Sequence, residues 1–67
     1  MNIKTTAYQI NECTCQNYYG NKITIPAGIW HVTEDDVCYT LTHGTDMTQI
    51  SKAEFNRLLE EGFVSKK

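Results

Sequence analysis

The fold is decided by residues 50–63, which read ISKAEFNRLLEEGF. Ser51 and Glu54 have the S-x-x-E spacing of a capping box, in which each side chain satisfies a free backbone amide of the other residue. Ile50 and Phe55 occupy the two positions of a hydrophobic staple, which sets the angle at which a chain enters a helix. The sequence therefore predicts that a helix begins immediately after Ser51.

The same stretch predicts which face of the helix is buried and where the helix ends. An apolar stripe at i, i+3 and i+4 is formed by Phe55, Leu58 and Leu59. Gly62 stands where a left-handed residue closes a helix, and Phe63 stands where it can contact Leu58 across a Schellman turn. We therefore expect an amphipathic helix over about residues 51–61.

Two acids run against this otherwise consistent helix. Glu60 and Glu61 lie in the last turn, where exposed carbonyl groups carry partial negative charge and a carboxylate costs about 0.3 kcal/mol or more. Arg57 lies three and four residues before them and can neutralise them locally. In the alternative interpretation a cation of a partner protein does so, and both acids then belong to a binding surface.

Alternating apolar residues predict short strands before the helix. These strands are expected at residues 3–10, 22–25, 29–33, 37–42 and 47–50. Turns are expected at Pro26-Ala27-Gly28 and at residues 43–46, because Pro fixes φ and Gly permits positive φ. Residues 11–21 are polar and predict a loop.

The central hairpin has a predicted register. A four-residue loop at residues 33–36 would join its two strands, and alternation would bury Trp30 in the core. The resulting cross-strand pairs are Trp30 with Tyr39, Val32 with Val37, and His31 with Cys38.

Short strands followed by one helix predict an α+β fold, in which a small antiparallel sheet of four to five strands curls and is closed by the helix. In the number and spacing of its strands, the segment over residues 22–64 resembles a small SH3-like barrel. Such barrels host many unrelated roles, so the resemblance implies an architecture and no particular function.

The length of 67 residues predicts a single domain over residues 1–67. A domain of this size buries only roughly 60% of the surface that its unfolded chain exposes, so its core is marginal. Self-association would supply further burial, and we therefore expect a homo-oligomer.

Charge and hydropathy argue against two classes of partner. The net charge is −2 and the largest basic cluster is Lys66-Lys67, whereas nucleic-acid binding needs several cations on one face. No apolar run approaches the roughly 20 residues of a membrane helix, and the polar start lacks a secretory signal. Three cysteines, an odd number, fit a reducing compartment. These features predict a cytoplasmic protein that binds neither membranes nor nucleic acid.

Cysteine and histidine supply the sharpest candidate chemistry, because thiolate and imidazole suit tetrahedral zinc. The candidate ligands are Cys13, Cys15, Cys38 and a histidine, with His31 favoured over His43. The C-x-C spacing departs from usual zinc knuckles, so the competing interpretation is three small buried apolar residues and no cofactor. A thiol enzyme would need a base beside Cys13 or Cys15, and no motif places one there.

Protein binding is the predicted function. Tyr18 and Tyr19 lie in the predicted loop, and aromatic residues are enriched at interface hot spots. The acidic tip Glu34-Asp35-Asp36 would attract a basic partner. We expect a small non-enzymatic regulator or inhibitor of the kind that phages and mobile elements encode against host machinery. The alternative is a zinc-stabilised mini-domain.

Overall fold

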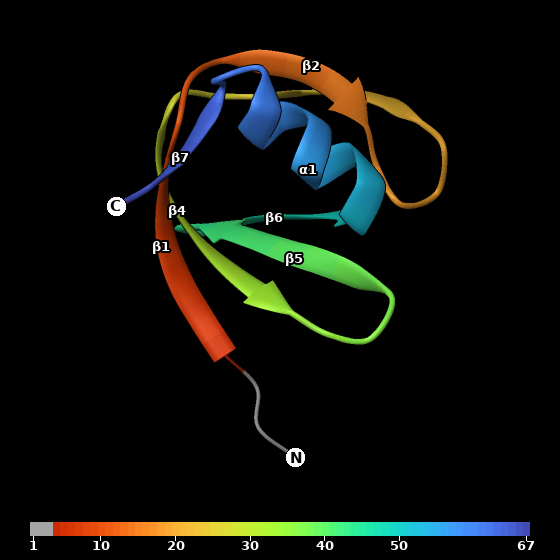
Figure 1. Ribbon diagram of the computed structural model, residues 1–67, viewed down its shortest axis with the longest axis horizontal. Coiled ribbons are helices and arrows are strands. Elements are labelled where there is room, and N and C mark those ends of the chain that lie inside the picture. The colour runs from red at the N-terminus through yellow and green to blue at the C-terminus, as the bar shows by residue number, and fades with distance from the viewer. Residues whose placement is uncertain (1–3) are drawn as a thin grey trace.

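The computed structural model describes residues 4–67 as seven strands and one helix (Figure 1). The elements are β1 (Lys4–Ile10), β2 (Cys13–Gln16), β3 (Lys22–Ile25), β4 (Gly28–Glu34), β5 (Cys38–His43), β6 (Asp46–Ser51), α1 (Lys52–Glu60) and β7 (Val64–Lys66). The larger sheet has the order β6-β5-β4-β1-β7, β2 and β3 form a second sheet, and all pairings are antiparallel. The predicted α+β class is confirmed. Ile3, the first residue of the predicted N-terminal strand, lies outside the described residues.

The helix ends as predicted. The amide of Phe63 donates to the Leu58 carbonyl at 3.0 Å, and the amide of Gly62 donates to the Leu59 carbonyl at 3.2 Å. These two bonds define a Schellman motif, and Gly62 has the positive φ of 84° that the motif requires.

Among residues 4–67 there is no helix with the length and apolarity that a membrane crossing requires.

Only half of the predicted capping box forms at the start of the helix. Ser51 is the N-cap, and its hydroxyl accepts a hydrogen bond from the Glu54 amide at 3.2 Å. The Glu54 carboxylate instead binds the Gln16 amide and the Arg57 guanidinium. The side chain that was expected to cap the helix therefore ties α1 to β2.

Two strands were not predicted from the sequence. Residues 11–21 contain β2, in which Cys13 and Cys15 are buried and the residues between and after them are exposed. The prediction of a loop there was wrong because two small thiols are a weak apolar signal. Strand β7 is only three residues long and pairs Val64 with Ile10 of β1, a contact between distant parts of the chain. Residues 4–67 therefore contain seven strands rather than the four or five predicted.

The predicted register of the central hairpin was wrong. Val32 pairs with Leu41 instead of Val37, His31 with Thr42 instead of Cys38, and Tyr39 with Glu34 instead of Trp30. The pairing moves because β4 continues to Glu34 and leaves only residues 35–37 for the loop.

The short hairpin loop is held by Asp35. Its carboxylate Oδ1 accepts hydrogen bonds from the amides of Val37 and Cys38, each at 2.9 Å. The shift from Val37 to Leu41 is an even number of residues, so it preserves the face on which each paired side chain lies. Trp30 is buried as predicted, whereas Val37 falls in the loop and is 60% exposed.

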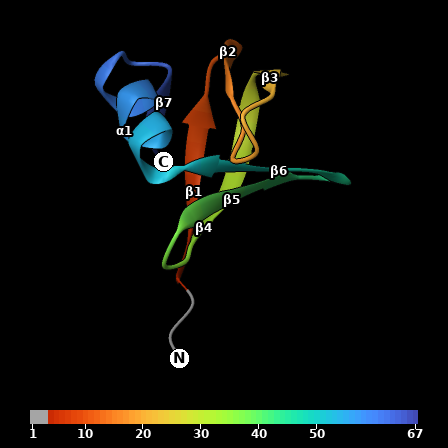
Figure 2. The same cartoon turned by 90° about the vertical axis from the view of Figure 1, so that its right-hand side faces the viewer.

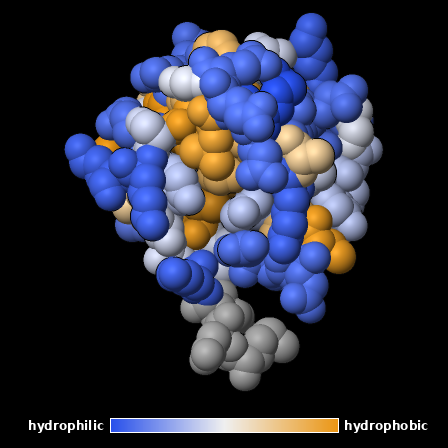
Figure 3. Space-filling view, viewed as in Figure 1, coloured by the Kyte–Doolittle hydropathy of each residue, from blue (hydrophilic) through white to orange (hydrophobic). Residues whose placement is uncertain are grey.

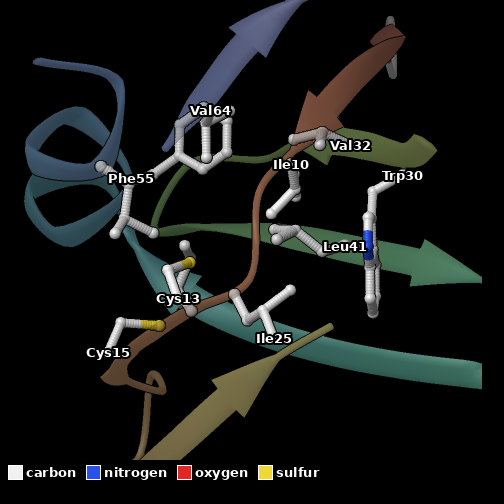
Figure 4. Packing of buried hydrophobic residues seen from close by; sticks show 11 residues of the cluster. Ile10, Cys13, Cys15, Ile25, Trp30, Val32, Leu41, Phe55 and Val64 are labelled. Atoms are coloured by element: carbon white, nitrogen blue, oxygen red, sulfur yellow. The ribbon is translucent and has the colours of Figure 1, made fainter. Parts of the chain in front are cut away.

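The core lies between β5 and β6 on one side and α1 with the β2–β3 hairpin on the other (Figure 1, Figure 2). Every element contributes at least one side chain to it, and Figure 4 shows how they meet. The buried members are Ile10, Cys13, Cys15, Ile25, Trp30, Val32, Leu41, Ile50, Phe55, Leu58 and Val64. In Figure 3 the face seen in Figure 1 is mostly hydrophilic, with apolar side chains visible at its centre.

Phe55 is the side chain through which the helix packs on the larger sheet. Its ring is fully buried and lies edge-on to Tyr8 of β1, with centroids 5.3 Å apart at 89°. It also lies 4.3 Å from the ring of Tyr39 of β5, at 31°. Three elements that are distant in sequence therefore meet at one ring.

Replacing Phe55 with Ala is expected to lower the free energy of unfolding by about 3–5 kcal/mol, because a buried ring is lost and a cavity remains. Urea denaturation followed by far-UV circular dichroism measures this. Val37→Ala is the control at an exposed apolar position, with an expected change below about 0.5 kcal/mol. A loss below about 1 kcal/mol for Phe55→Ala would contradict the central role of this ring.

Candidate functional site

The loop that carries Tyr18 and Tyr19 has a defined conformation. The Asn17 amide donates to the Asn21 carbonyl at 2.8 Å, and the Gly20 amide donates to the Asn17 carbonyl at 3.0 Å. The Asn17 side-chain oxygen accepts from the amides of Tyr19 and Asn21, at 3.0 and 2.9 Å. Gly20 has a φ of 87°, which glycine adopts without strain. The hairpin tip between β2 and β3 is thus closed by its own hydrogen bonds.

The hairpin tip is also docked on β6. The Tyr18 amide donates to the Gln49 carbonyl at 2.6 Å, and the Tyr19 hydroxyl donates to the Gln49 side-chain oxygen at 3.1 Å. The two tyrosine rings pack edge to face, with centroids 5.5 Å apart. Tyr18 is 44% and Tyr19 72% exposed. Two aromatic rings are therefore held in place and open to solvent, as a binding surface needs.

A groove of about 420 Å³ separates the hairpin tip from the start of α1. Its walls include Gln16, Asn17, Tyr18, Ser51, Glu54 and Arg57. One wall is aromatic and polar, and the other carries an ion pair. The groove is open at the surface, so a side chain of a partner can enter it.

The ion pair at this groove links three charged side chains. Arg57 Nε donates to Glu54 Oε1 at 2.9 Å and Arg57 Nη2 to Glu54 Oε2 at 3.1 Å, while Nη1 donates to Glu61 at 2.9 Å. The Gln16 amide donates to the same Glu54 carboxylate at 2.9 Å. The Arg57 guanidinium, and then this amide, lower the pKa of Glu54 to about 2. The two carboxylates raise the pKa of Arg57 in turn.

The acidic hairpin loop lies near the same end of the molecule. In Figure 1 this loop, after β4, and the tip after β2 both lie at the right, beside the start of α1. Glu34 forms an ion pair with Lys52, the first residue of α1, at 3.3 Å. Hydrogen bonds from the amides of Cys38 and Val37 lower the pKa of Asp35, so this side chain remains ionised as it holds its loop.

We call the surface formed by Tyr18, Tyr19, Glu34, Asp35, Asp36 and Val37 the loop end. Ser51 connects its two halves, since it pairs with Cys38 in the sheet and lines the groove with Tyr18. The fold thus gathers five of the predicted binding residues at one end of the molecule. Sequence reasoning missed the exposed Val37, because the predicted register buried it.

Glu60 and Glu61 lie apart from this surface, in the last turn of α1 and at its C-cap. Glu61 is neutralised by Arg57, as the local interpretation of these acids predicted. Glu60 is exposed and forms no ion pair within residues 4–67.

The predicted zinc ligands do not come together. Cys13 and Cys15 lie in the core, whereas Cys38 is buried outside that cluster, with its Sγ 3.8 Å from an Asp35 oxygen. His31 is exposed on the opposite face of β4 from the buried Trp30. In the described part of the chain, residues 4–67, no three metal-binding side chains form a cluster. The sequence could not reveal this, because the loop expected over residues 11–21 left the positions of Cys13 and Cys15 undefined and the predicted register wrongly paired His31 with Cys38.

His43, Cys13 and Cys15 contribute to the packing of the fold. The His43 ring stacks on Trp30 at 5.1 Å, and its Nδ1 lies 2.9 Å from the Ile29 carbonyl oxygen. Burial raises the pKa of Cys15 to about 11, and burial also raises the pKa of Cys13. Both thiols are therefore protonated near neutral pH, which removes the nucleophilic thiolate.

The Glu54–Arg57 pair predicts acid sensitivity. The pKa of Glu54 falls from 4.5 to about 2 in the fold, so the ionised carboxylate stabilises the protein above about pH 4.5. This contribution is lost as the pH falls from there through 2. Glu54→Gln should cost about 1 kcal/mol at neutral pH and flatten the fall of the urea midpoint below about pH 4.5. Glu60→Gln is the matched control, and an identical pH profile for both variants would contradict this role.

The buried thiols predict slow alkylation. At about pH 8, iodoacetamide should modify Cys13 and Cys15 at least about tenfold more slowly in the folded protein than in urea, because little thiolate is present and access is blocked. Peptide mass spectrometry gives the rate at each site. Rapid modification of either thiol in the folded protein would instead support a nucleophilic cysteine.

No protein-family model matches this chain, and comparison with curated proteins and with solved structures finds no significant match. The function is therefore argued from the geometry of the surface itself.

Proposed function

We propose that this chain is a small non-enzymatic regulator or inhibitor that binds another protein through the loop end. The observation that carries the proposal is the hairpin tip, whose backbone is fixed by hydrogen bonds within the loop and to Gln49. The exposed Tyr19 ring is held by its hydroxyl on Gln49, and the Tyr18 ring packs edge to face against it. A surface that is ordered before binding loses less conformational entropy when a partner arrives.

The aromatic rings supply the energy of such an interface. Tyrosine buries a large area with few rotatable bonds, and hot spots are enriched in it. The groove beside Tyr18 gives a partner side chain a place to enter, and the exposed Val37 adds apolar area nearby. These features support a compact interface with an aromatic centre.

The acids supply selectivity. Asp35 and Asp36 are exposed, and Glu34 is balanced by Lys52. A basic patch on the partner would complement the remaining negative charge, increase the association rate and make it dependent on salt.

We further propose that the curled larger sheet belongs to the SH3-like class and that the protein is cytoplasmic. It would be a factor of phage or mobile-element type that acts on host machinery. Self-association is included because the domain is small, and native mass spectrometry measures it. The zinc-stabilised alternative is not proposed, because its ligands lie apart.

The test is affinity capture from the native host with the wild-type chain and with Tyr18→Ala/Tyr19→Ala. The double variant should bind the captured partner at least about thirtyfold more weakly, as expected for the loss of a hot spot of about 2 kcal/mol. Its hydrogen bonds through the Tyr18 and Tyr19 amides are kept, so folding should be retained, and circular dichroism checks this.

Glu60→Gln is the matched control, since it changes an exposed side chain outside the loop end. It should leave the affinity unchanged. Equal affinity of the double tyrosine variant and the wild type for every captured protein would rule out the loop end as the binding surface.

A further inference from the structure

We propose that the open edge of β6 accepts an extended segment of a partner protein as an added strand. An apolar side chain of that segment enters the groove between β3 and β6, and a Lys or Arg side chain meets Asp46. This surface is separate from the loop end, so either proposal can fail without the other.

The groove lies where the two sheets fail to close on each other. Strand β6 is an edge strand of the larger sheet, and β3 is one of the two strands of the smaller sheet, the β2–β3 hairpin. Between them lies a groove of about 310 Å³ with walls that include Ile23, Ile25, Pro26, Trp30, Met47 and Thr48. Trp30 lines the groove although it is only 2% exposed, and its indole N–H is already satisfied by the Pro26 carbonyl at 3.1 Å. The space suits one apolar side chain.

The backbone of β6 points hydrogen-bonding groups toward this groove at Met47. Gln49 pairs with Thr40 in the sheet, yet its carbonyl accepts from the Tyr18 amide outside the sheet. The backbone N–H and C=O of Gln49 therefore point away from β5. Along an antiparallel strand such outward-pointing residues alternate with inward-pointing ones, so the backbone groups of Met47 point outward as well. Within residues 4–67 no segment outside the β5–β6 hairpin forms a backbone hydrogen bond with Met47.

The backbone of β3 is arranged in the same way at Thr24. The Gln16 amide donates to Glu54 rather than across the hairpin, so Gln16 and its partner Lys22 face outward. By the same alternation, the backbone groups of Thr24 point outward. Its hydroxyl lies 3.5 Å from that of Thr14, which is consistent with a cross-strand pair that exchanges no backbone hydrogen bonds and so brings its side chains close together. Backbone donors and acceptors thus lie on both walls of the groove.

The open part of the β6 edge carries neither Lys nor Pro, two residues that commonly protect an exposed edge from pairing. The opposite edge, β7, is only three residues long and carries Lys66. Residues 46–48, the open part of β6, contain neither Lys nor Pro, and Met47 is 67% exposed. Unprotected edges of this kind are the ones that accept additional strands.

A short segment of another protein fits this edge better than a second β6. The Tyr18 amide occupies Gln49 and limits the open edge to residues 46–48. If the β6 strands of two copies paired antiparallel with Met47 opposite Met47, residue 45 of one copy would lie opposite Gln49 of the other. The Gln49 carbonyl is already bonded to the Tyr18 amide, so this pairing is blocked there. Asp46 is the one charged residue among those lining the groove in the described chain, so a cation two residues from the apolar side chain complements it.

The probe is the capped hexapeptide Val-Thr-Leu-Thr-Lys-Thr, titrated into the ¹⁵N-labelled chain. Chemical-shift changes should concentrate at the Met47 and Thr24 amides and the Trp30 indole. Changing Leu to Ala or Lys to Glu in the peptide should weaken binding by about tenfold. Two further peptides are N-methylated at alternate residues, one at the odd-numbered and one at the even-numbered positions. Only one of these two sets of amides faces β6, so one methylated peptide should lose binding and the other should keep it.

Met47→Pro is the matching change in the protein. It removes an outward N–H that the sheet does not use, so the fold should survive and peptide binding should be lost. Met47→Leu keeps that N–H and should bind as the wild type does. Shifts confined to the loop end, equal binding by both N-methylated peptides, or no binding at about 1 mM would overturn the proposal. Concentration-dependent dimerisation that shifts Met47 without peptide would overturn it in favour of a second copy.

Discussion

The packing of Phe55 against Tyr8 and Tyr39 is the interaction on which the other parts of this molecule depend. The larger sheet has one face to bury, and the helix brings only Phe55 and Leu58 as fully buried residues. Because so little apolar area is available, the core also recruits Cys13 and Cys15 of β2. The link from Glu54 and Arg57 to the Gln16 amide then holds β2 against the helix.

Both candidate binding surfaces are consequences of that arrangement. The β2–β3 hairpin covers the core as a separate sheet, so its tip rests on Gln49 of β6 without continuing the ladder. On one side of the tip lies the groove along α1, and on the other lies the groove between the two sheet edges. Both grooves are open at the surface of the part of the chain that the structure describes, residues 4–67.

The predictions that succeeded rested on local interactions, and those that failed depended on distant ones. The Ser51 cap, the Gly62 stop and the strand over residues 22–25 involve neighbours within a few residues, so their side chains reveal them. The hairpin register depended on how far β4 extends, which the Asp35 turn decides. Of the candidate site, the tyrosines, the acids and the pairing of Glu61 with Arg57 were recognisable, whereas the docking of Tyr18 on Gln49 was not.

By itself the sequence determined the α+β class, both ends of the helix, its buried stripe and most strand positions, because periodicity and capping act within one or two turns of chain. Only the tertiary structure decided that Cys13 and Cys15 face the core and that His31 pairs with Thr42 rather than Cys38, which separates the expected zinc ligands. It also decided that the tyrosine tip, the acidic loop and the start of α1 share one end, and that β6 keeps an open edge. These relations depend on which surfaces meet when a small core is closed, and no local pattern encodes that.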